Sequence, residues 1–145
     1  MTFKKVTDPK LDGTDANDNL TGNSKDDKLV GGKGDDKLDG GKGNDKLDGS
    51  DGDDYLDGGK GNNILTGGKG KNTFVLNRGT GFDTIKDFKV GEDHLKLSHL
   101  GSGTGFQDLT FTQKGSDTLI NSGSDQLAVL KGIRTDQITA SDFRH

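Results

Sequence analysis

A nine-residue repeat limits what this chain can fold into more than any other feature of its sequence. Seven consecutive copies run from Gly13 to Val75, namely GTDANDNLT, GNSKDDKLV, GGKGDDKLD, GGKGNDKLD, GSDGDDYLD, GGKGNNILT and GGKGKNTFV. Every copy begins with glycine and has a large apolar residue at its eighth position. A unit this small cannot bury its apolar side chain alone, so the copies must stack on one another.

Each copy divides into a tight turn and a short strand. The eighth residue lies mostly between polar residues, which predicts a strand with one side chain in the core. Glycines at positions one, two and four predict a turn that visits positive φ and approaches its neighbours closely. Stacking the strands about 4.8 Å apart would form an apolar ladder and align the turns. The ladder residues are Leu20, Leu29, Leu38, Leu47, Leu56, Leu65 and Phe74.

Without the repeat, the composition would describe a disordered chain. Only 26% of the residues are hydrophobic, 30% are charged, and 25 are glycine. Such a chain buries too little apolar surface to offset the entropy lost on folding, unless a bound metal adds free energy. The acidic residues number 24, and all but Glu92 are aspartate, which is suited to tight turns. Cysteine is absent, which excludes disulfides and zinc sites built on sulfur.

The copy GGKGDDKLD resembles the RTX nonapeptide GGxGxDxUx of calcium-binding proteins, in which U is large and apolar. The resemblance implies an all-β, right-handed parallel β-roll, a β-solenoid in which each nonapeptide forms half a turn of the coil. Copy n then stacks on copy n+2, and calcium lies between the stacked turns. Calcium fits because it takes six to eight hard oxygen ligands, whereas magnesium demands a smaller octahedron and keeps its waters.

The resemblance assigns two groups of ligands to about five or more calcium ions. The side-chain ligands are Asp18, Asp27, Asp36, Asp45, Asp54, Asn63 and Asn72 at the sixth position, and Asp83 and Asp93 in two degenerate copies that follow. The turn carbonyl ligands are Gly32, Gly34, Gly41, Gly43, Gly52, Gly59, Gly61, Gly68 and Gly70.

Stacking of copy n on copy n+2 predicts which sixth-position residues meet. The pairs are Asp18–Asp36, Asp27–Asp45, Asp36–Asp54, Asp45–Asn63 and Asp54–Asn72, with Asp83 opposite Asn63 and Asp93 opposite Asn72. Weaker sites are expected at the asparagines, because an amide oxygen carries no charge. Ala16 and Lys25 stand where glycine belongs, which predicts strained turns or an incomplete site at the amino-terminal end.

The flanks of the repeat divide the chain into three parts. Residues 1–12 are predicted to form an amino-terminal cap, 13–97 the β-roll, and 98–145 a carboxy-terminal β cap that includes the region of a secretion signal. Lys10–Asp12 matches positions seven to nine of a unit with Pro9 at its sixth position, which predicts a capping strand without a metal. The segment from Phe74 onward resembles the cap of β-rolls in type I secreted proteases and alginate epimerases.

The predicted carboxy-terminal cap contains three strand-like segments, at 109–112, 118–121 and 126–130. Gly-Ser-Asp turns at 115–117 and 123–125 separate them. Each turn is also compatible with a further degenerate repeat, but their spacing of eight and the longer strands favour hairpins.

Motifs of catalysis are missing from the sequence. His94 and His99 are five apart without an HExxH pattern, and there is no phosphate-binding G-x-x-x-x-G-K-[ST] or G-x-S-x-G motif. The nine-residue phase of the aspartates assigns them to a repeated role rather than to a catalytic pair. No apolar run reaches the length of a membrane span, and no signal peptide is visible. With only eight aromatic residues and no recognition helix, nucleic-acid binding is not expected.

The lysines of the repeat leave two interpretations open. In the β-roll, Lys28 and Lys46 would share one face, and Lys42 and Lys60 one edge. They would either bind a polyanion such as a uronate polysaccharide, or form a solvated surface that offsets the aspartates and discourages edge pairing. The formal net charge is −4, so about five bound calcium ions would make the chain net basic.

The sequence therefore predicts a non-enzymatic module whose folding is driven by calcium outside the cell. Cytosolic calcium is scarce, so the chain would stay unfolded there and suit export by type I secretion machinery, then fold where calcium is abundant. The alternative is a module that binds a uronate or alginate-like polysaccharide and is appended to a secreted enzyme. Ice binding or adhesion would need a regular threonine face, which the mixed residues at position nine argue against.

Overall fold

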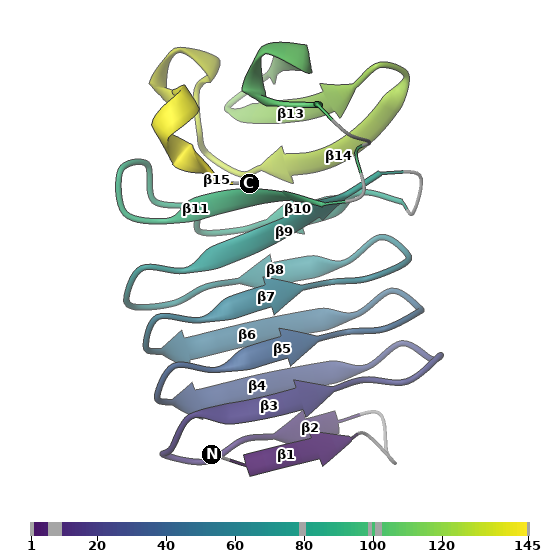
Figure 1. The fold of residues 1–145 in the computed structure, drawn as a ribbon, viewed down its shortest axis with the longest axis vertical. Helices are drawn as coiled ribbons and strands as arrows, with labels where there is room; N and C mark the ends of the chain where they lie inside the picture. Colours follow the sequence, from purple (N-terminus) through teal and green to yellow (C-terminus); the bar gives the residue numbers. More distant parts are fainter. Residues whose placement is uncertain (1, 6–9, 79–80, 99, 101–102, 145) are drawn as a thin grey trace.

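The chain forms a flattened coil of two facing β-sheets, shown in Figure 1 from its purple amino-terminal end to its yellow carboxy-terminal end. The structure is a computed structural model, and it describes all residues except 1, 6–9, 79–80, 99, 101–102 and 145. Successive strands alternate between the two sheets, so each pair of strands completes one turn of the coil (Figure 1). The predicted all-β solenoid architecture is confirmed.

The two sheets take alternate strands along the coil, and the three hairpin strands that follow it all join the eight-stranded sheet. The seven-stranded sheet has the order β1 (Thr2–Lys5), β3 (Asp18–Thr21), β5 (Lys37–Asp39), β7 (Tyr55–Asp57), β9 (Thr73–Asn77), β11 (His94–Ser98) and β15 (Phe143–Arg144). The eight-stranded sheet has the order β12 (Leu109–Lys114), β13 (Asp117–Ser122), β14 (Asp125–Leu130), β10 (Asp83–Ile85), β8 (Ile64–Thr66), β6 (Lys46–Asp51), β4 (Lys28–Lys33) and β2 (Lys10–Asp12). All pairings in the coil are parallel, whereas β12, β13 and β14 pair antiparallel.

The register confirms that copy n stacks on copy n+2. Leu20 pairs with Leu38, and Leu38 with Leu56, each eighteen residues apart. Beyond the seventh copy the spacing grows, because Thr84 pairs with Ile64 and His94 with Thr73. The chain therefore continues the coil through two degenerate copies, after insertions of two and then one more residue.

The apolar ladder is the core of the coil. All seven eighth-position side chains are at most 1% exposed, and Ile85 and Leu95 continue the ladder at 0%. Phe88 closes its upper end against Phe74, with ring centroids 6.2 Å apart. The core is only one side chain wide, so the turns at both edges lie close to it.

The carboxy-terminal part covers the end of the coil. The predicted hairpins are confirmed, since β12 pairs antiparallel with β13, and β13 with β14. Parallel pairing of β14 with β10 and of β15 with β11 joins this part to the coil. Three short 3₁₀ helices accompany them: η1 (Phe106–Asp108), η2 (Thr135–Gln137) and η3 (Ala140–Asp142). Within the described residues, no helix has the length and hydrophobicity to cross a membrane. Pro9, His99 and His145 lie outside the described residues, as does part of the predicted amino-terminal cap.

The strain predicted for the first two turns is absent. Neither Ala16 nor Lys25 has a positive φ. Instead, the Ala16 amide donates to the Thr14 hydroxyl at 3.1 Å, and the Lys25 amide donates to the Asn23 side chain at 2.8 Å. These side-chain bonds close the turn locally, so that glycine is not needed.

We expect Ser50→Gly to stabilise the calcium-loaded fold by up to about 1 kcal/mol, measured by urea unfolding. Ser50 has a φ of 78°, and it is the only non-glycine with a positive φ among the described residues. Thr14→Gly at the same repeat position is the control. Thr14 has no positive φ and its hydroxyl bonds to Asp18, so this change should destabilise. Destabilisation by both changes would contradict the account of strain at Ser50.

Candidate metal centre

The turns form two stacks along the edges of the coil. The odd stack contains the turns at 13–18, 31–36, 49–54 and 67–72, and the even stack those at 22–27, 40–45 and 58–63. We call the space between two successive turns of one stack a level. Each level brings together residues about one coil apart in the sequence.

The sixth-position side chains form a buried ladder across these levels. None of the nine predicted side-chain ligands is more than 4% exposed. At each level, a sixth-position amide donates to the Oδ1 atom of the residue above. These bonds connect Asp18 to Asp36, Asp27 to Asp45, Asp36 to Asp54, Asp45 to Asn63, Asp54 to Asn72 and Asn72 to Asp93 at 2.7–3.0 Å, and Asn63 to Asp83 at 3.3 Å. The structure thus brings together all seven predicted pairs.

Five carboxylate oxygens of this ladder are buried without a hydrogen-bond partner. They are Oδ1 of Asp18 and Asp27, and Oδ2 of Asp36, Asp45 and Asp54. Burying an unpaired carboxylate oxygen is costly unless a cation or a donor compensates it. A divalent ion that prefers hard oxygen ligands fits this requirement, so the residues present suit calcium.

The remaining ligands of such an ion would come from the backbone. Among the described residues, no group of three or more His, Cys, Asp or Glu side chains could hold a metal by itself. All nine glycines predicted as carbonyl ligands have a positive φ. A Cβ atom at Gly61 would collide with the carbonyl oxygen of Gly43, and one at Gly31 would collide with Oδ2 of Asp36. The turns therefore need glycine to keep carbonyl and carboxylate oxygens close together.

Burial makes five of the ladder carboxylates, those of Asp36, Asp45, Asp54, Asp83 and Asp93, harder to ionise by raising their pKa. It raises the pKa of Asp45 to about 6, with the neighbouring charge of Asp27 adding to the effect. It raises the pKa of Asp54 to about 7, with Asp36 adding, and that of Asp83 also to about 7. Hydrogen bonds from the stacked amides oppose these shifts without cancelling them. A bound dication would favour the ionised forms.

Comparison with known proteins gives the same result as the geometry. A profile described as the RTX calcium-binding nonapeptide repeat (4 copies) matches residues 12–47 and 48–85. The chain belongs to this RTX family.

Two solved structures resemble this RTX chain over most of its length. The AlgE6R2 subunit of a mannuronan C5-epimerase from Azotobacter vinelandii is 29% identical, with a TM-score of 0.59, over 83% of this chain and 88% of that one. The extracellular lipase LipA from Serratia marcescens is 18% identical, with a TM-score of 0.51, over 97% of this chain. The chain spans 40% of the length of that lipase, which shares the fold. A search of curated proteins finds no significant match.

A second ladder of hydrogen bonds, at the fifth position of the RTX repeat, was not predicted. Here the side-chain oxygen of one copy accepts from the backbone amide two copies later, opposite in direction to the sixth-position ladder. The acceptors are Asn17, Asp26, Asp35, Asn44, Asp53 and Asn62, at 2.7–3.1 Å. The sequence shows Asn or Asp at this position in six of seven copies, so the pattern was readable.

The lysines of the RTX repeat are stacked as predicted. Lys28 pairs with Lys46 on the outer face of the eight-stranded sheet, and Lys42 forms a parallel bridge with Lys60. Among the described residues, none of these four lysines forms an ion pair. The odd stack differs at the third repeat position, which Lys42 and Lys60 occupy in the even stack. There the order is Asp15, Lys33, Asp51 and Lys69, with ion pairs at 2.9 Å and 3.0 Å.

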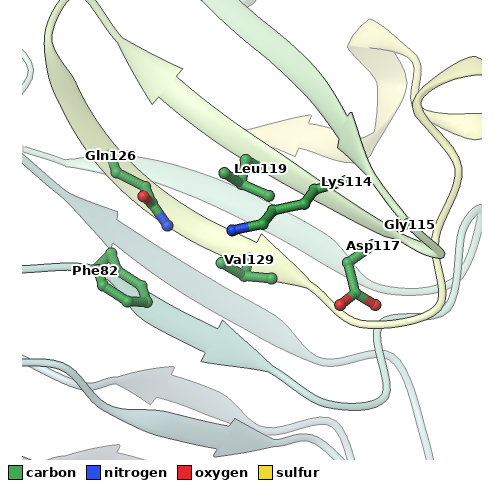
Figure 2. A pocket seen from close by; sticks show the side chains of 7 residues that line it. All are labelled: Phe82, Lys114, Gly115, Asp117, Leu119, Gln126 and Val129. Atoms are coloured by element: carbon green, nitrogen blue, oxygen red, sulfur yellow. The ribbon is translucent and has the colours of Figure 1, made fainter.

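Figure 2 shows a pocket of about 450 Å³ on the outer face of the cap. Phe82, Leu119 and Val129 form its apolar floor beneath Lys114 and Gln126. The carboxylate at its rim, Asp117, is engaged by Lys131 at 2.6 Å and by the Gly132 amide at 2.8 Å. The Asp117 carboxylate therefore links the start of β13 to the segment that follows β14. On the other sheet, the one described histidine, His94, lies 3.3 Å from the Arg144 guanidinium.

We expect the metal-free fold to become more stable as the pH falls from about 7 toward 4. Asp45, Asp54 and Asp83 have raised pKa values, so in this range the folded state binds more protons than the unfolded chain. The free energy of unfolding then decreases as the pH rises. Far-ultraviolet circular dichroism of the chelated protein at about pH 5 and pH 7.5 measures this, as a larger content of β-structure at the lower pH.

Saturating calcium should reverse this pH dependence, because protons and calcium compete for the same carboxylates. A chelated protein that holds less β-structure at the lower pH than at the higher one would contradict the burial of these groups.

Proposed function

We propose that this RTX chain is a calcium-binding module that folds outside the cell and supports the secretion and stability of an extracellular protein. The observation that carries the proposal is the set of five buried carboxylate oxygens without hydrogen-bond partners. Each lies where the turn of one copy stacks on that of another. Calcium at these levels would link turns eighteen residues apart, which the hydrogen bonds of the ladder do only in part.

Metal binding and folding are coupled in such an arrangement. The levels exist only when successive coils are stacked, so the unfolded chain has no preformed site, and the binding free energy becomes folding free energy. Where calcium is scarce, burial of the aspartates opposes folding. Where it is abundant, the stacked turns form. Such a chain would pass unfolded through type I secretion machinery and fold beyond it.

We further propose that the module is not itself an enzyme. The aspartates at the fifth and sixth positions serve the repeated ladders, and their partners are of the same kind from level to level. The activity of any longer protein would then belong to another part of it. In this proposal the module contributes calcium-dependent folding and stability to that protein.

The test is a calcium titration of metal-free protein followed by far-ultraviolet circular dichroism, with magnesium as the control. We expect a cooperative transition from coil to β-structure with calcium alone, because magnesium does not fit large, carbonyl-rich sites. A chain that is already β-rich in chelator and unchanged by calcium would contradict the proposal.

Asp36→Asn provides a sharper form of the same test. Asp36 meets both Asp18 and Asp54, so its loss should weaken two levels and raise the calcium midpoint at least tenfold. Asp35→Asn is the matched control, because it removes the same charge at the fifth position, where Asn17 and Asn44 already occur. Equal midpoints for the two variants would show that the charge of Asp36 has no special role.

A second candidate function is binding of a polyanionic polysaccharide, such as a uronate polymer. It is favoured by the similarity to the AlgE6R2 subunit of a mannuronan C5-epimerase. The positive charge would come from the stacked lysines that form no ion pair among the described residues, Lys28 with Lys46 and Lys42 with Lys60.

We expect mannuronan oligomers to bind the calcium-loaded chain with an affinity that falls as salt is added. Lys28→Gln with Lys46→Gln should weaken binding about tenfold, whereas Lys33→Gln with Lys69→Gln should have little effect, since those lysines are already ion-paired. Calorimetric titration of both double variants measures this. Equal loss in the two double variants, or binding that is insensitive to salt, would contradict a role for the Lys28–Lys46 face.

A further inference from the structure

The last level of the odd stack is closed by charged side chains rather than by another repeated turn. It lies between the turn at 67–72 and the segment 87–93, which precedes β11. The Lys89 ammonium donates to the Gly68 carbonyl oxygen at 2.7 Å. The Asp87 carboxylate accepts from the amides of Gly67 and Gly68, both at 2.8 Å. Both charged groups thus bind the backbone of the turn below.

The same carbonyl position has a neutral donor at lower levels. The Ser50 carbonyl accepts from the backbone amide of Lys69 at 2.8 Å, and the Gly41 carbonyl from that of Lys60 at 2.8 Å. At the last level, the donor to the Gly68 carbonyl is an ammonium group instead. A full positive charge is therefore fixed beside the turn at this level.

The side-chain oxygens of the last level are also satisfied. Asp93 accepts from the Asn72 amide at 2.8 Å and, through its other oxygen, from the Lys89 amide at 2.9 Å. Asn72 accepts from the Asp54 amide at 3.0 Å. The buried atom of this level that lacks a partner is Nδ2 of Asn72. That atom is a hydrogen-bond donor, which disfavours a cation, whereas the unpaired atoms of the five aspartates attract one.

Electrostatics at this level agree with the geometry. Burial raises the pKa of Asp93 above its usual value, and the charge of Asp87 adds to the shift. The positive charge of Lys89 opposes it. The charge of Lys89 thus acts on this carboxylate in the same direction as a bound metal ion would.

We propose that the Lys89 ammonium takes the place of a metal ion at this level, so that Asp87, Lys89 and Asp93 close the odd stack without calcium. The inference rests on the proposed function, because it identifies a level that lacks the ion bound at others. It would remove Gly68 and Asp93 from the predicted ligands, and would leave Asn72 as a ligand only at the level that it shares with Asp54. A chain that keeps one level permanently closed would bind fewer ions than it has stacked pairs.

The test compares two double variants of the full chain. Asn72→Asp with Lys89→Met restores a carboxylate and removes the ammonium. Asn72→Asp with Lys69→Met is the matched control, because Lys69 belongs to the same turn and makes only an exposed ion pair with Asp51. Equilibrium dialysis against calcium counts the ions bound per chain. We expect one more ion in the Lys89 double variant than in the control, and equal counts would overturn the proposal.

A single substitution covers the case in which the Lys89 double variant does not fold. Lys89→Met should raise the calcium midpoint of folding at least threefold relative to Lys69→Met, because the last turn loses its closing charge. Equal midpoints would overturn the inference.

The same two single variants separate this inference from the proposed function. If the unmodified chain binds no calcium, the proposed function fails by itself. The inference is then judged by thermal unfolding, where Lys89→Met should melt several degrees below Lys69→Met. Equal melting temperatures would overturn it.

Discussion

The burial of a carboxylate against a backbone amide one coil away is the interaction on which the rest of this structure depends. It repeats at every level from Asp18–Asp36 to Asp36–Asp54 and beyond, and it leaves one oxygen of each of five aspartates without a partner. In water such a bond would contribute little, and in the protein interior the unpaired oxygen opposes folding. In the proposed function, bound calcium supplies the positive charge that compensates for these oxygens.

The apolar ladder stabilises the interior of the coil, and the stacked turns stabilise its edges. One large side chain per nine residues fills the interior between two sheets, and each is almost fully buried. A core this thin fixes the spacing of the strands but leaves the edges as stacked polar backbone. The turns can stack this closely because glycine has no Cβ atom. A Cβ at a position such as Gly61 would collide with a carbonyl oxygen of the coil below. Core and edge thus specify the same register independently.

The strict period explains why so much could be predicted from sequence. Once copy n lies on copy n+2, the pairing of Leu20 with Leu38 and of Asp45 with Asn63 follows directly. The closure of the first two turns by Thr14 and Asn23 did not follow, because a side chain there replaces the conformational freedom of glycine. The contact of Lys89 with Gly68 could not be read either, since it depends on the path of the chain after the period breaks. The fifth-position ladder is predictable from the sequence, because Asn or Asp recurs there in six of the seven copies.

The alternating charges on the odd edge favour stacking of the correct copies in a chain whose repeats are nearly identical. Correct stacking places Lys33 against Asp15 and Lys69 against Asp51. A chain that looped out one whole coil would instead set Asp15 against Asp51, or Lys33 against Lys69, at the same strand spacing. The leucine ladder and the turns would largely tolerate that error, because they are similar from coil to coil. The ion pairs would be replaced by a contact between like charges, so they disfavour stacking in which a coil has been skipped.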